Sequence, residues 1–271
     1  PQTLHFPRNS FFFFPNMLAY TAKLQLHNFL DNRDLCALSV VSPEIMLTLR
    51  TSLCRRIVDI CRPNAMCRKG CLYALRLLRA ANIHATSRGA NAAAENGHLD
   101  VLRDLRAHGI HATSYGANWA AEKGHLDVLR DLRAHGIHAA YYSADRVARN
   151  GYLDVLRDLR AHDIYATSVG ADWAAKNGHL DVVRDLRIAN IHATSCGADC
   201  AAENGHLNII RDLRAHDIHA TIHGADSAAH YGHFDVLRDL RAHGIYVTSR
   251  GADRAAENGH LEILRDLRIA N

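Results

Sequence analysis

The sequence lacks long apolar runs, and it is poor in aromatic residues and proline. Aromatic residues make up 7% of the 271 residues, and only five residues are proline. No segment approaches the roughly 18 consecutive apolar residues of a membrane-spanning helix. The phenylalanine run 11–14 ends at Pro15, which is shorter than the roughly 7–15 apolar residues of a secretion signal. We therefore expect an intracellular protein, cytoplasmic or nuclear, that has no membrane partner.

Neither the cysteines nor the net charge points to a metal site or to a nucleic-acid partner. The seven cysteines have no repeated spacing, which is typical of a reducing compartment. Cys54, Cys61, Cys67 and Cys71 lack the short C-x₂-C pairs of structural zinc sites, so we expect small buried residues there. The net charge of +4 is small, and arginine alternates with aspartate. This alternation argues against a nucleic-acid partner.

What the sequence does contain is a repeat. Glycine recurs every 27 residues from Gly70 to Gly259, and the ten letters GHLDVLRDLR of Gly97–Arg106 recur unchanged at Gly124–Arg133. A fixed period between 20 and 50 residues predicts a solenoid. One such unit is too small to bury its own apolar face, so the units must stack on one another.

Each unit has the pattern of two helices. After the glycine, Val128, Leu129 and Leu132 fall on one side of a helical projection, and Asp127 and Arg130 fall on the other, which predicts an amphipathic helix. Before the glycine, alanines share one face of a shorter helix suited to close packing. Gly, Asn or Asp ends the first helix, and Thr or Ser precedes the second. We predict an all-α helical-repeat solenoid of about eight helix–turn–helix units, which begin near Cys61, Arg88, Tyr115, Tyr142, Val169, Cys196, His223 and Arg250.

The repeated unit resembles a known family. The letters WAAEKGHLDVLRDLRAHGI of Trp119–Ile137 are similar to the AA-x-x-GH-x-x-VV-x-x-L core of ankyrin repeats. The unit is shorter than the usual 33 residues, and the TPLH start of the family is replaced by YGAN or RGAD. The resemblance therefore implies an ankyrin-like solenoid with short loops. Similar shortened repeats occur in proteins of large DNA viruses, which would place the protein in a host cell.

The repeated His, Asp and Arg residues could form a metal or acid–base site, but their recurrence favours a structural role. Asp127 and Arg130 are three residues apart, where opposite charges attract by about 0.2–0.5 kcal/mol. Stacked units would align Asp and Arg columns, each exposed pair contributing about 0–1 kcal/mol. We expect the histidines at the helix junctions to bond loop backbone. No nucleophile–base pair or phosphate loop stands out, so we expect no enzymatic activity, no metal and no cofactor.

Variation among the copies is concentrated at three positions of the shorter helix, four and three residues apart, which share the face opposite the alanines. Drift alone would explain variability, but it does not predict large aromatic residues on a solvent face. Tyr, Trp and Arg are enriched at binding hot spots. We predict a strip that binds a protein with acidic and apolar features, and the ankyrin resemblance places it on the concave face. Its residues are Tyr115, Trp119, Tyr142, Arg146, Arg149, Trp173, Lys176, Arg250 and Arg254.

One segment lies outside the 27-residue pattern. The letters FLDNRDLCALSVVS of Phe29–Ser42 resemble the middle of an F-box, although Ala19 stands at the proline position of that motif and the tryptophan after VS is absent. The alternative is a helical cap on the end of the stack. The F-box resemblance implies docking on the small adaptor subunit of a cullin-type ubiquitin ligase through Leu18, Leu24, Leu26, Leu30, Leu35 and Leu38.

Four regions and two functional hypotheses follow. We predict a flexible leader at 1–16, an F-box-like helical segment at 17–50, a linker or cap at 51–63 and ankyrin-like repeats at 64–271. The leading hypothesis is an adaptor, in which the F-box-like segment recruits the ligase (SCF type) and the array selects the target protein. The alternative is a plain ankyrin-repeat scaffold or inhibitor that sequesters a partner without ubiquitylation. In either case we expect a monomer.

Overall fold

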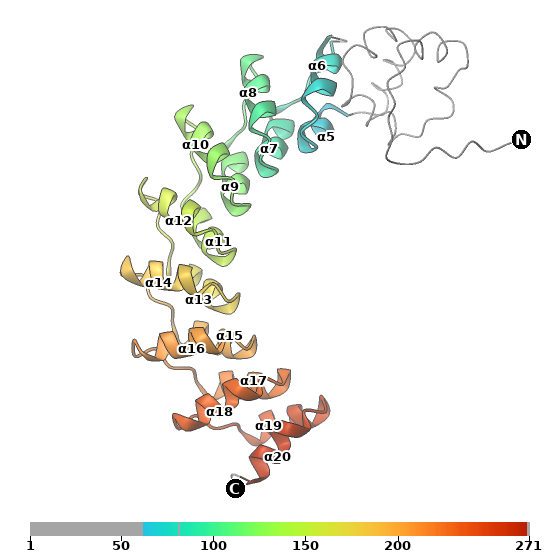
Figure 1. The fold of residues 1–271 in the computed structure, drawn as a ribbon. Helices are drawn as coiled ribbons and strands as arrows, with labels where there is room; N and C mark the ends of the chain where they lie inside the picture. The colour runs from blue at the N-terminus through green and yellow to red at the C-terminus, as the bar shows by residue number, and fades with distance from the viewer. Residues whose placement is uncertain (1–61, 81, 270–271) are drawn as a thin grey trace, which may run out of the picture.

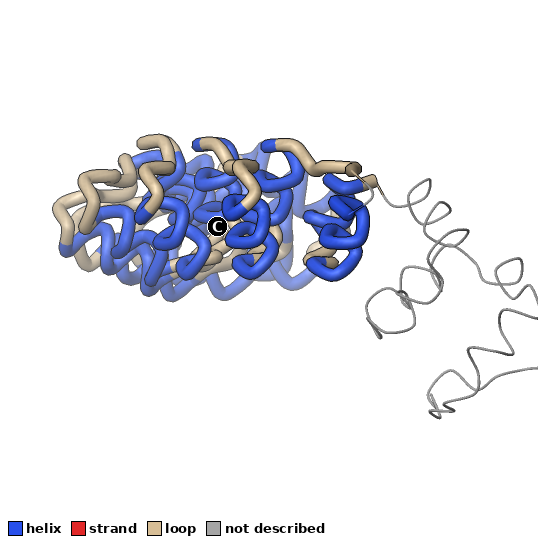
Figure 2. Tube along the Cα trace, turned by 90° about the horizontal axis from the view of Figure 1, so that it is seen from above, coloured by secondary structure: helices blue, strands red, loops and turns tan. Residues whose placement is uncertain are grey.

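The computed structural model describes residues 62–80 and 82–269, and in these residues the chain is a stack of paired helices without a strand (Figure 2). Sixteen helices form eight pairs, so the predicted all-α solenoid of about eight helix–turn–helix units is confirmed. The helices are α5 Pro63–Arg68, α6 Leu72–Ala80, α7 Ser87–Glu95, α8 Leu99–Ala107, α9 Ser114–Glu122, α10 Leu126–Ala134, α11 Ser143–Arg149, α12 Leu153–Arg160, α13 Ser168–Lys176, α14 Leu180–Ile188, α15 Ser195–Glu203, α16 Leu207–Arg214, α17 Ile222–Tyr231, α18 Phe234–Ala242, α19 Ser249–Glu257 and α20 Leu261–Ile269. The longest, α17, has 10 residues, and none of the described helices could span a bilayer.

The turn after each even-numbered helix from α6 to α18 passes through the left-handed region of backbone conformation. Gly136 has φ +75° there, and Asp163 has φ +60° at the equivalent position. Glycine adopts this conformation freely, and Asn and Asp are the residues that tolerate it best among the others. This requirement explains why only Gly, Asn or Asp ends these helices, as the sequence predicted.

The helices form two layers. Figure 1 shows the stack bent into an arc, with α9, α11, α13 and α15 on its inner side and α10, α12, α14 and α16 on its outer side. The interior between the layers is filled by apolar side chains of the outer helices, such as Val128 (0% exposed) and Leu132 (2%), and by alanines of the inner helices, such as Ala120 and Ala121 (both 0%). The predicted apolar faces therefore meet each other.

Inner helices pack closely because small residues line their contacts. The inner helices touch one another extensively along the stack, whereas neighbouring outer helices meet at few points. At Gly197 of α15, an added Cβ would lie 2.4 Å from Asp172 Oδ1 of α13, so no larger residue fits without movement. Glycine and alanine therefore draw the inner layer together, and the bulkier outer layer spreads, which bends the stack toward its inner side.

A pair of hydrogen bonds, which we call the staple, joins each inner helix to the start of the next inner helix. Asp172 of α13 accepts the backbone N–H of Thr194 through Oδ1 at 2.6 Å, and it accepts the Thr194 hydroxyl through Oδ2 at 2.8 Å. The Thr194 hydroxyl in turn accepts the N–H of Cys196 at 3.1 Å, which caps α15 as predicted. In an earlier unit Asn91 accepts the N–H of Thr113 and donates to its hydroxyl at 2.9 Å. A hydroxyl can donate or accept, so Asn and Asp both serve in this position.

An ion-pair ladder joins the outer helices. Asp131 of α10 accepts from Arg103 Nε at 3.0 Å and from Arg106 Nη1 at 2.6 Å, both on α8. The same arrangement recurs at Asp104, Asp131, Asp158, Asp185, Asp212 and Asp239. The predicted pairing of Asp127 with Arg130 is wrong, since Asp127 forms no ion pair within the described residues. It lies exposed in the first turn of α10.

The ladder carboxylates are also more buried than the predicted exposed pairs. The Asp158 side chain is only 6% exposed. Burial alone would raise the pKa of this carboxyl, but the hydrogen bonds and charges of Arg133 and Arg130 outweigh it and hold the pKa below its usual range. The pKa is lowered in the same way, against the effect of burial, at the other ladder positions, which are Asp104, Asp131, Asp185, Asp212 and Asp239.

Replacing a ladder carboxylate should destabilise the fold. We expect Asp158→Asn to lower the free energy of unfolding by about 1–3 kcal/mol, because the bidentate contact with two arginines is lost in a site with little water. Asp154→Asn, on the exposed start of the same helix, is the matched control and should change it by about 0.5 kcal/mol or less. Urea denaturation of the two variants measures both values. Equal effects would show that the ladder does not stabilise the stack.

The same lowered pKa values set the direction of the pH dependence. A carboxyl whose pKa is lower in the folded chain contributes stability that is complete above its unfolded value, about 3.9. That contribution is lost as the pH falls through the folded value. Six such carboxyls act together, so the free energy of unfolding should fall steeply below about pH 4, and less steeply in Asp158→Asn.

Candidate partner-binding surface

The predicted strip residues lie on the inner helices and are largely open to solvent. Tyr115 is 62% exposed, Trp119 38%, Tyr142 39% and Trp173 37%. Tyr115 and Trp119 lie on α9, Tyr142 precedes α11, and the next four positions are spread over α11 and α13. The structure thus brings seven predicted residues onto three consecutive inner helices, which we call the central strip: Tyr115, Trp119, Tyr142, Arg146, Arg149, Trp173 and Lys176.

Two predicted residues do not join this group. Arg250 and Arg254 lie on α19, three units further along the stack. Arg250 is exposed and Arg254 is half-buried. Equivalent positions line the whole stack, but the aromatic residues predicted for the strip lie only in the central strip.

Side chains of the central strip hold one another in place. The rings of Tyr115 and Trp119 have centroids 6.3 Å apart. The Arg149 guanidinium of α11 lies 5.7 Å from the centroid of the Trp173 ring of α13, within the range of a cation–π contact. Such contacts keep the rings ordered before a partner arrives, which lowers the conformational entropy lost on binding.

The contact between α9 and α11 departs from the repeat. Ser143 occupies the position that is glycine in the neighbouring inner helices, and α11 packs on α9 less extensively than other inner neighbours pack on each other. Asn118 of α9 adapts by accepting the buried Ser143 hydroxyl at 2.8 Å and by donating to the Tyr142 hydroxyl at 2.8 Å. The added Cβ and hydroxyl of Ser143 account for the looser contact, because glycine is what allows the close approach elsewhere.

Tyr141 is a candidate contact residue that the sequence analysis did not select. It is 81% exposed, and its ring stands edge-on to that of Tyr142 with centroids 5.7 Å apart. The equivalent residue is serine in the neighbouring units, as at Ser114 and Ser168. This departure from serine is visible in the sequence, but it lies just outside the three variable helix positions.

Histidines that precede or end the outer helices bond backbone carbonyls, as expected from their positions, whereas His84 and His192 lie against asparagine side chains. His98 Nε2 lies 3.0 Å from the carbonyl oxygen of Arg68, and His260 Nε2 lies 2.9 Å from that of His230. These histidines tie the start of one outer helix to the end of the inner helix one unit earlier. No group of three or more His, Cys, Asp or Glu side chains within the described residues is arranged to hold a metal ion.

The first cysteines of the described region have a packing role. Cys67 is fully buried, and burial raises the pKa of its thiol to about 12. A thiol that stays protonated is a poor metal ligand and a poor nucleophile. Cys54 and Cys61 lie outside the described residues.

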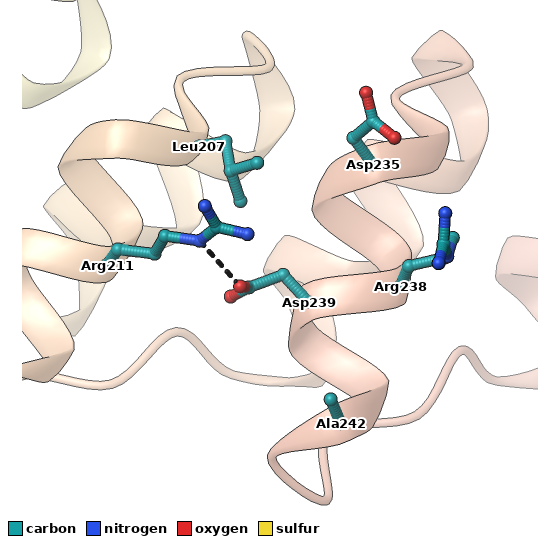
Figure 3. A pocket seen from close by; sticks show the side chains of 6 residues that line it. All are labelled: Leu207, Arg211, Asp235, Arg238, Asp239 and Ala242. Atoms are coloured by element: carbon teal, nitrogen blue, oxygen red, sulfur yellow. Dashed lines mark hydrogen bonds and ion pairs between the residues drawn. The ribbon is translucent and has the colours of Figure 1, made fainter.

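A shallow pocket on the outer layer belongs to the ladder. It lies between α16 and α18 (Figure 3) and is lined by Leu207, Arg211, Asp235, Arg238, Asp239 and Ala242. Within it, Arg211 Nε donates to Asp239 Oδ1 at 2.8 Å. Because Arg and Asp recur at these positions in other units, the pocket is a copy of the repeated outer groove and has no chemistry of its own.

The F-box-like prediction falls outside the described residues. This applies to the regions 1–16 and 17–50, to nearly all of 51–63, and to the predicted docking residues Leu18, Leu24, Leu26, Leu30, Leu35 and Leu38. The described part of the chain bears only on the repeats.

Comparison with known proteins identifies no family. No family model matches the chain, and no curated protein matches it. Among solved structures, the chain is similar to the pentatricopeptide repeat protein PPR10 in complex with an 18-nt psaJ RNA element, with 13% identity and a TM-score of 0.34 over 89% of this chain. A cysteine-to-serine variant of that protein with the same RNA element gives the same values. The chain spans about half (48%) of the length of that protein. Neither the ankyrin-repeat nor the F-box family is identified.

The predicted exclusion of nucleic acid is corrected by these comparisons. Both similar structures are helical-repeat proteins in complex with RNA, so an exclusion based on overall charge does not hold. The physical reason is that the alternating Arg and Asp residues lie in the outer ladder and neutralise each other there. The alternation of Arg and Asp is a property of the outer helices, so it does not predict the charge of the inner face.

The exposure of the tryptophans predicts a clear difference in folding stability. Each tryptophan keeps somewhat more than a third of its surface exposed, so we expect Trp119→Ala or Trp173→Ala to lower the free energy of unfolding by about 1 kcal/mol. Leu132→Ala removes a side chain that is 2% exposed and should lower it by about 2–5 kcal/mol.

A matched control comes from the repeat itself. Ile188 is 85% exposed and stands where most other units have alanine, so Ile188→Ala should leave stability within about 0.5 kcal/mol of the unmodified chain. Chemical denaturation measures all four variants. Unfolding caused by the tryptophan substitutions would mean that these side chains belong to the core.

Proposed function

We propose that this chain is a helical-repeat scaffold that binds a partner protein along the inner face of the stack. In this proposal the chain acts by binding, as a monomer in the cytoplasm or nucleus, and makes or breaks no covalent bond. The central strip provides the main contacts, with Trp119 and Trp173 as apolar anchors.

The observation that carries the proposal is that the constant residues make structural contacts, whereas the variable residues of the inner helices face solvent. Most of the repeated Asp, Arg, His and Thr side chains are engaged in the ladder, the junctions and the staples, and the repeated glycines allow the turns and the close helix contacts. The variable positions of the inner helices make few such contacts and carry large aromatic and cationic side chains that face solvent. Exposed Trp, Tyr and Arg gathered in one area are typical of a binding surface.

The finer proposal is that the bound protein is delivered to a ubiquitin ligase. It is supported by the F-box resemblance of FLDNRDLCALSVVS and by the position of that segment next to a binding array. The F-box-like segment would dock on the small adaptor subunit of a cullin-type ligase, and the ankyrin-like array would select the target. The alternative is the same scaffold without the ligase, which would sequester its partner.

Loss of the two indoles should abolish partner capture. We expect tagged full-length protein to lose its specific partner in Trp119→Ala/Trp173→Ala, with a loss of about 2 kcal/mol or more of binding free energy. The control is Tyr165→Ala/Tyr246→Ala, which removes two exposed rings (51% and 62%) from the loops outside the strip. Quantitative mass spectrometry of the captured proteins compares the two variants. Equal loss in the control, or capture that survives in the tryptophan variant, would contradict the proposal.

The ligase arm has a separate test. Co-purification with the ligase adaptor subunit should occur with the unmodified chain and be lost in Leu30→Asp/Leu35→Asp, since a charged group is costly in an apolar contact. The tryptophan variant should keep this interaction. Absence of binding, or binding unaffected by the two aspartates, would reject the ligase role and favour the plain scaffold.

A further inference from the structure

The charge of the inner face changes sign at two adjacent units. The last variable position of the inner helices is glutamate in four of the seven units from α7 to α19, and it is Arg149 on α11 and Lys176 on α13. The full series is Glu95, Glu122, Arg149, Lys176, Glu203, His230 and Glu257. Because four of the other five units hold glutamate at this position without loss of the fold, the stack does not require the two cations.

These two cations have no carboxylate partner within the described residues. Arg146, one turn away from Arg149 on α11, is paired with Glu122 of α9 at 2.9 Å. That pair also uses the carboxylate of Glu122, the one acid of the variable positions on α9, α11 and α13. The Arg149 guanidinium lies over the ring of Trp173, and Lys176 is exposed at the end of α13. Two unpaired positive charges therefore stand beside an exposed indole.

We propose that the central strip binds a short acidic segment of a protein, with an apolar side chain placed against Trp119 or Trp173 and with carboxylates placed at Arg149 and Lys176. This inference rests on the proposed scaffold function and adds the chemical class of the partner. Arginine suits a carboxylate because its guanidinium can donate two parallel hydrogen bonds. The indole face beside it offers the apolar contact that a purely ionic site would lack.

The extent of the positive charge favours a short segment over a long polyanion. Adjacent packed helices lie about 8–10 Å apart, so α9 to α13 span about 16–20 Å, which is the length of about five or six extended residues. Beyond this span the equivalent position of the inner helices is Glu95 on one side and Glu203 and Glu257 on the other. None of these three glutamates forms an ion pair within the described residues. Those carboxylates would repel an anionic polymer laid along the whole inner face.

Fluorescence anisotropy on the full chain tests the proposal with defined probes. The first probe is a labelled peptide of about ten residues, built from Asp and Glu with one Leu and one Phe at its centre. The second probe is the same peptide with Asn and Gln in place of its acids. The third is a labelled single-stranded RNA of similar length. We expect the acidic peptide to bind at least about tenfold more tightly than the neutral peptide, because only the acidic one can pair with the two cations.

Charge reversal supplies the decisive variant. Arg149→Glu/Lys176→Glu installs the residue that neighbouring units carry and should weaken acidic-peptide binding by at least about tenfold. The control Arg238→Glu/Arg265→Glu makes the same change in net charge on the outer helices α18 and α20, where both arginines are exposed and neither forms an ion pair in the described chain. That control should bind within about twofold of the unmodified chain. Urea denaturation of both variants checks that they remain folded.

The outcomes separate this inference from the proposed function. Equal affinity for the acidic and neutral peptides, no binding of either, or no effect of Arg149→Glu/Lys176→Glu would overturn the acidic class. Tighter binding of the RNA probe, lost in the same variant, would overturn it in favour of a nucleic-acid ligand. If the captured partner depends on Trp119 and Trp173 but is insensitive to the charge reversal, the scaffold function stands and the acidic class fails.

Discussion

The close approach of the inner helices is the contact on which the rest of the structure depends. One helix pair cannot enclose its own apolar face, so each unit is stable only against its neighbours. Gly197 shows how tight the contact is, because its Cα lies where a Cβ would strike Asp172. The staple from Asp172 to Thr194 then fixes the register of one unit on the next. The stack bends as a consequence, because the inner helices pack closer to one another than the outer helices do.

The outer ladder complements this contact with charge. Each buried ladder carboxylate is held by two arginines of the preceding outer helix, so charges of opposite sign meet at each step of the stack. These ion pairs and the hydrogen bonds of the histidines engage most of the repeated Asp, Arg and His side chains in structural contacts. A side chain whose hydrogen-bonding groups are already engaged has little left for a ligand. The inner face is different, because packing does not constrain its three variable positions and selection for a partner can act on them.

Much of the fold could be predicted from the sequence because its main determinants are local. The period, the two helical faces and the Gly, Asn or Asp turns follow from residue spacing. The alignment of Asp and Arg between stacked units was predictable, but the pairs themselves were not. Spacing within one helix favours Asp127 with Arg130, whereas the actual partners of Asp131 lie on the preceding outer helix, α8. The placement of the inner strip was predictable, and Tyr141 also departs visibly from the serine of neighbouring units. The looser contact at Ser143 required the packing of α11 on α9 to be seen.

The central claim is that constant residues build the stack and variable inner residues bind the partner. The most direct measurement is the unfolding and partner binding of one redesigned chain, in which all seven variable triplets carry the Arg, Ala and Glu of Arg88, Ala92 and Glu95. The account predicts that the urea midpoint falls by no more than the Trp119→Ala and Trp173→Ala substitutions lower it together, and that partner binding is lost completely. A redesigned chain that still binds the partner, or that unfolds as readily as one with a broken core, would contradict it.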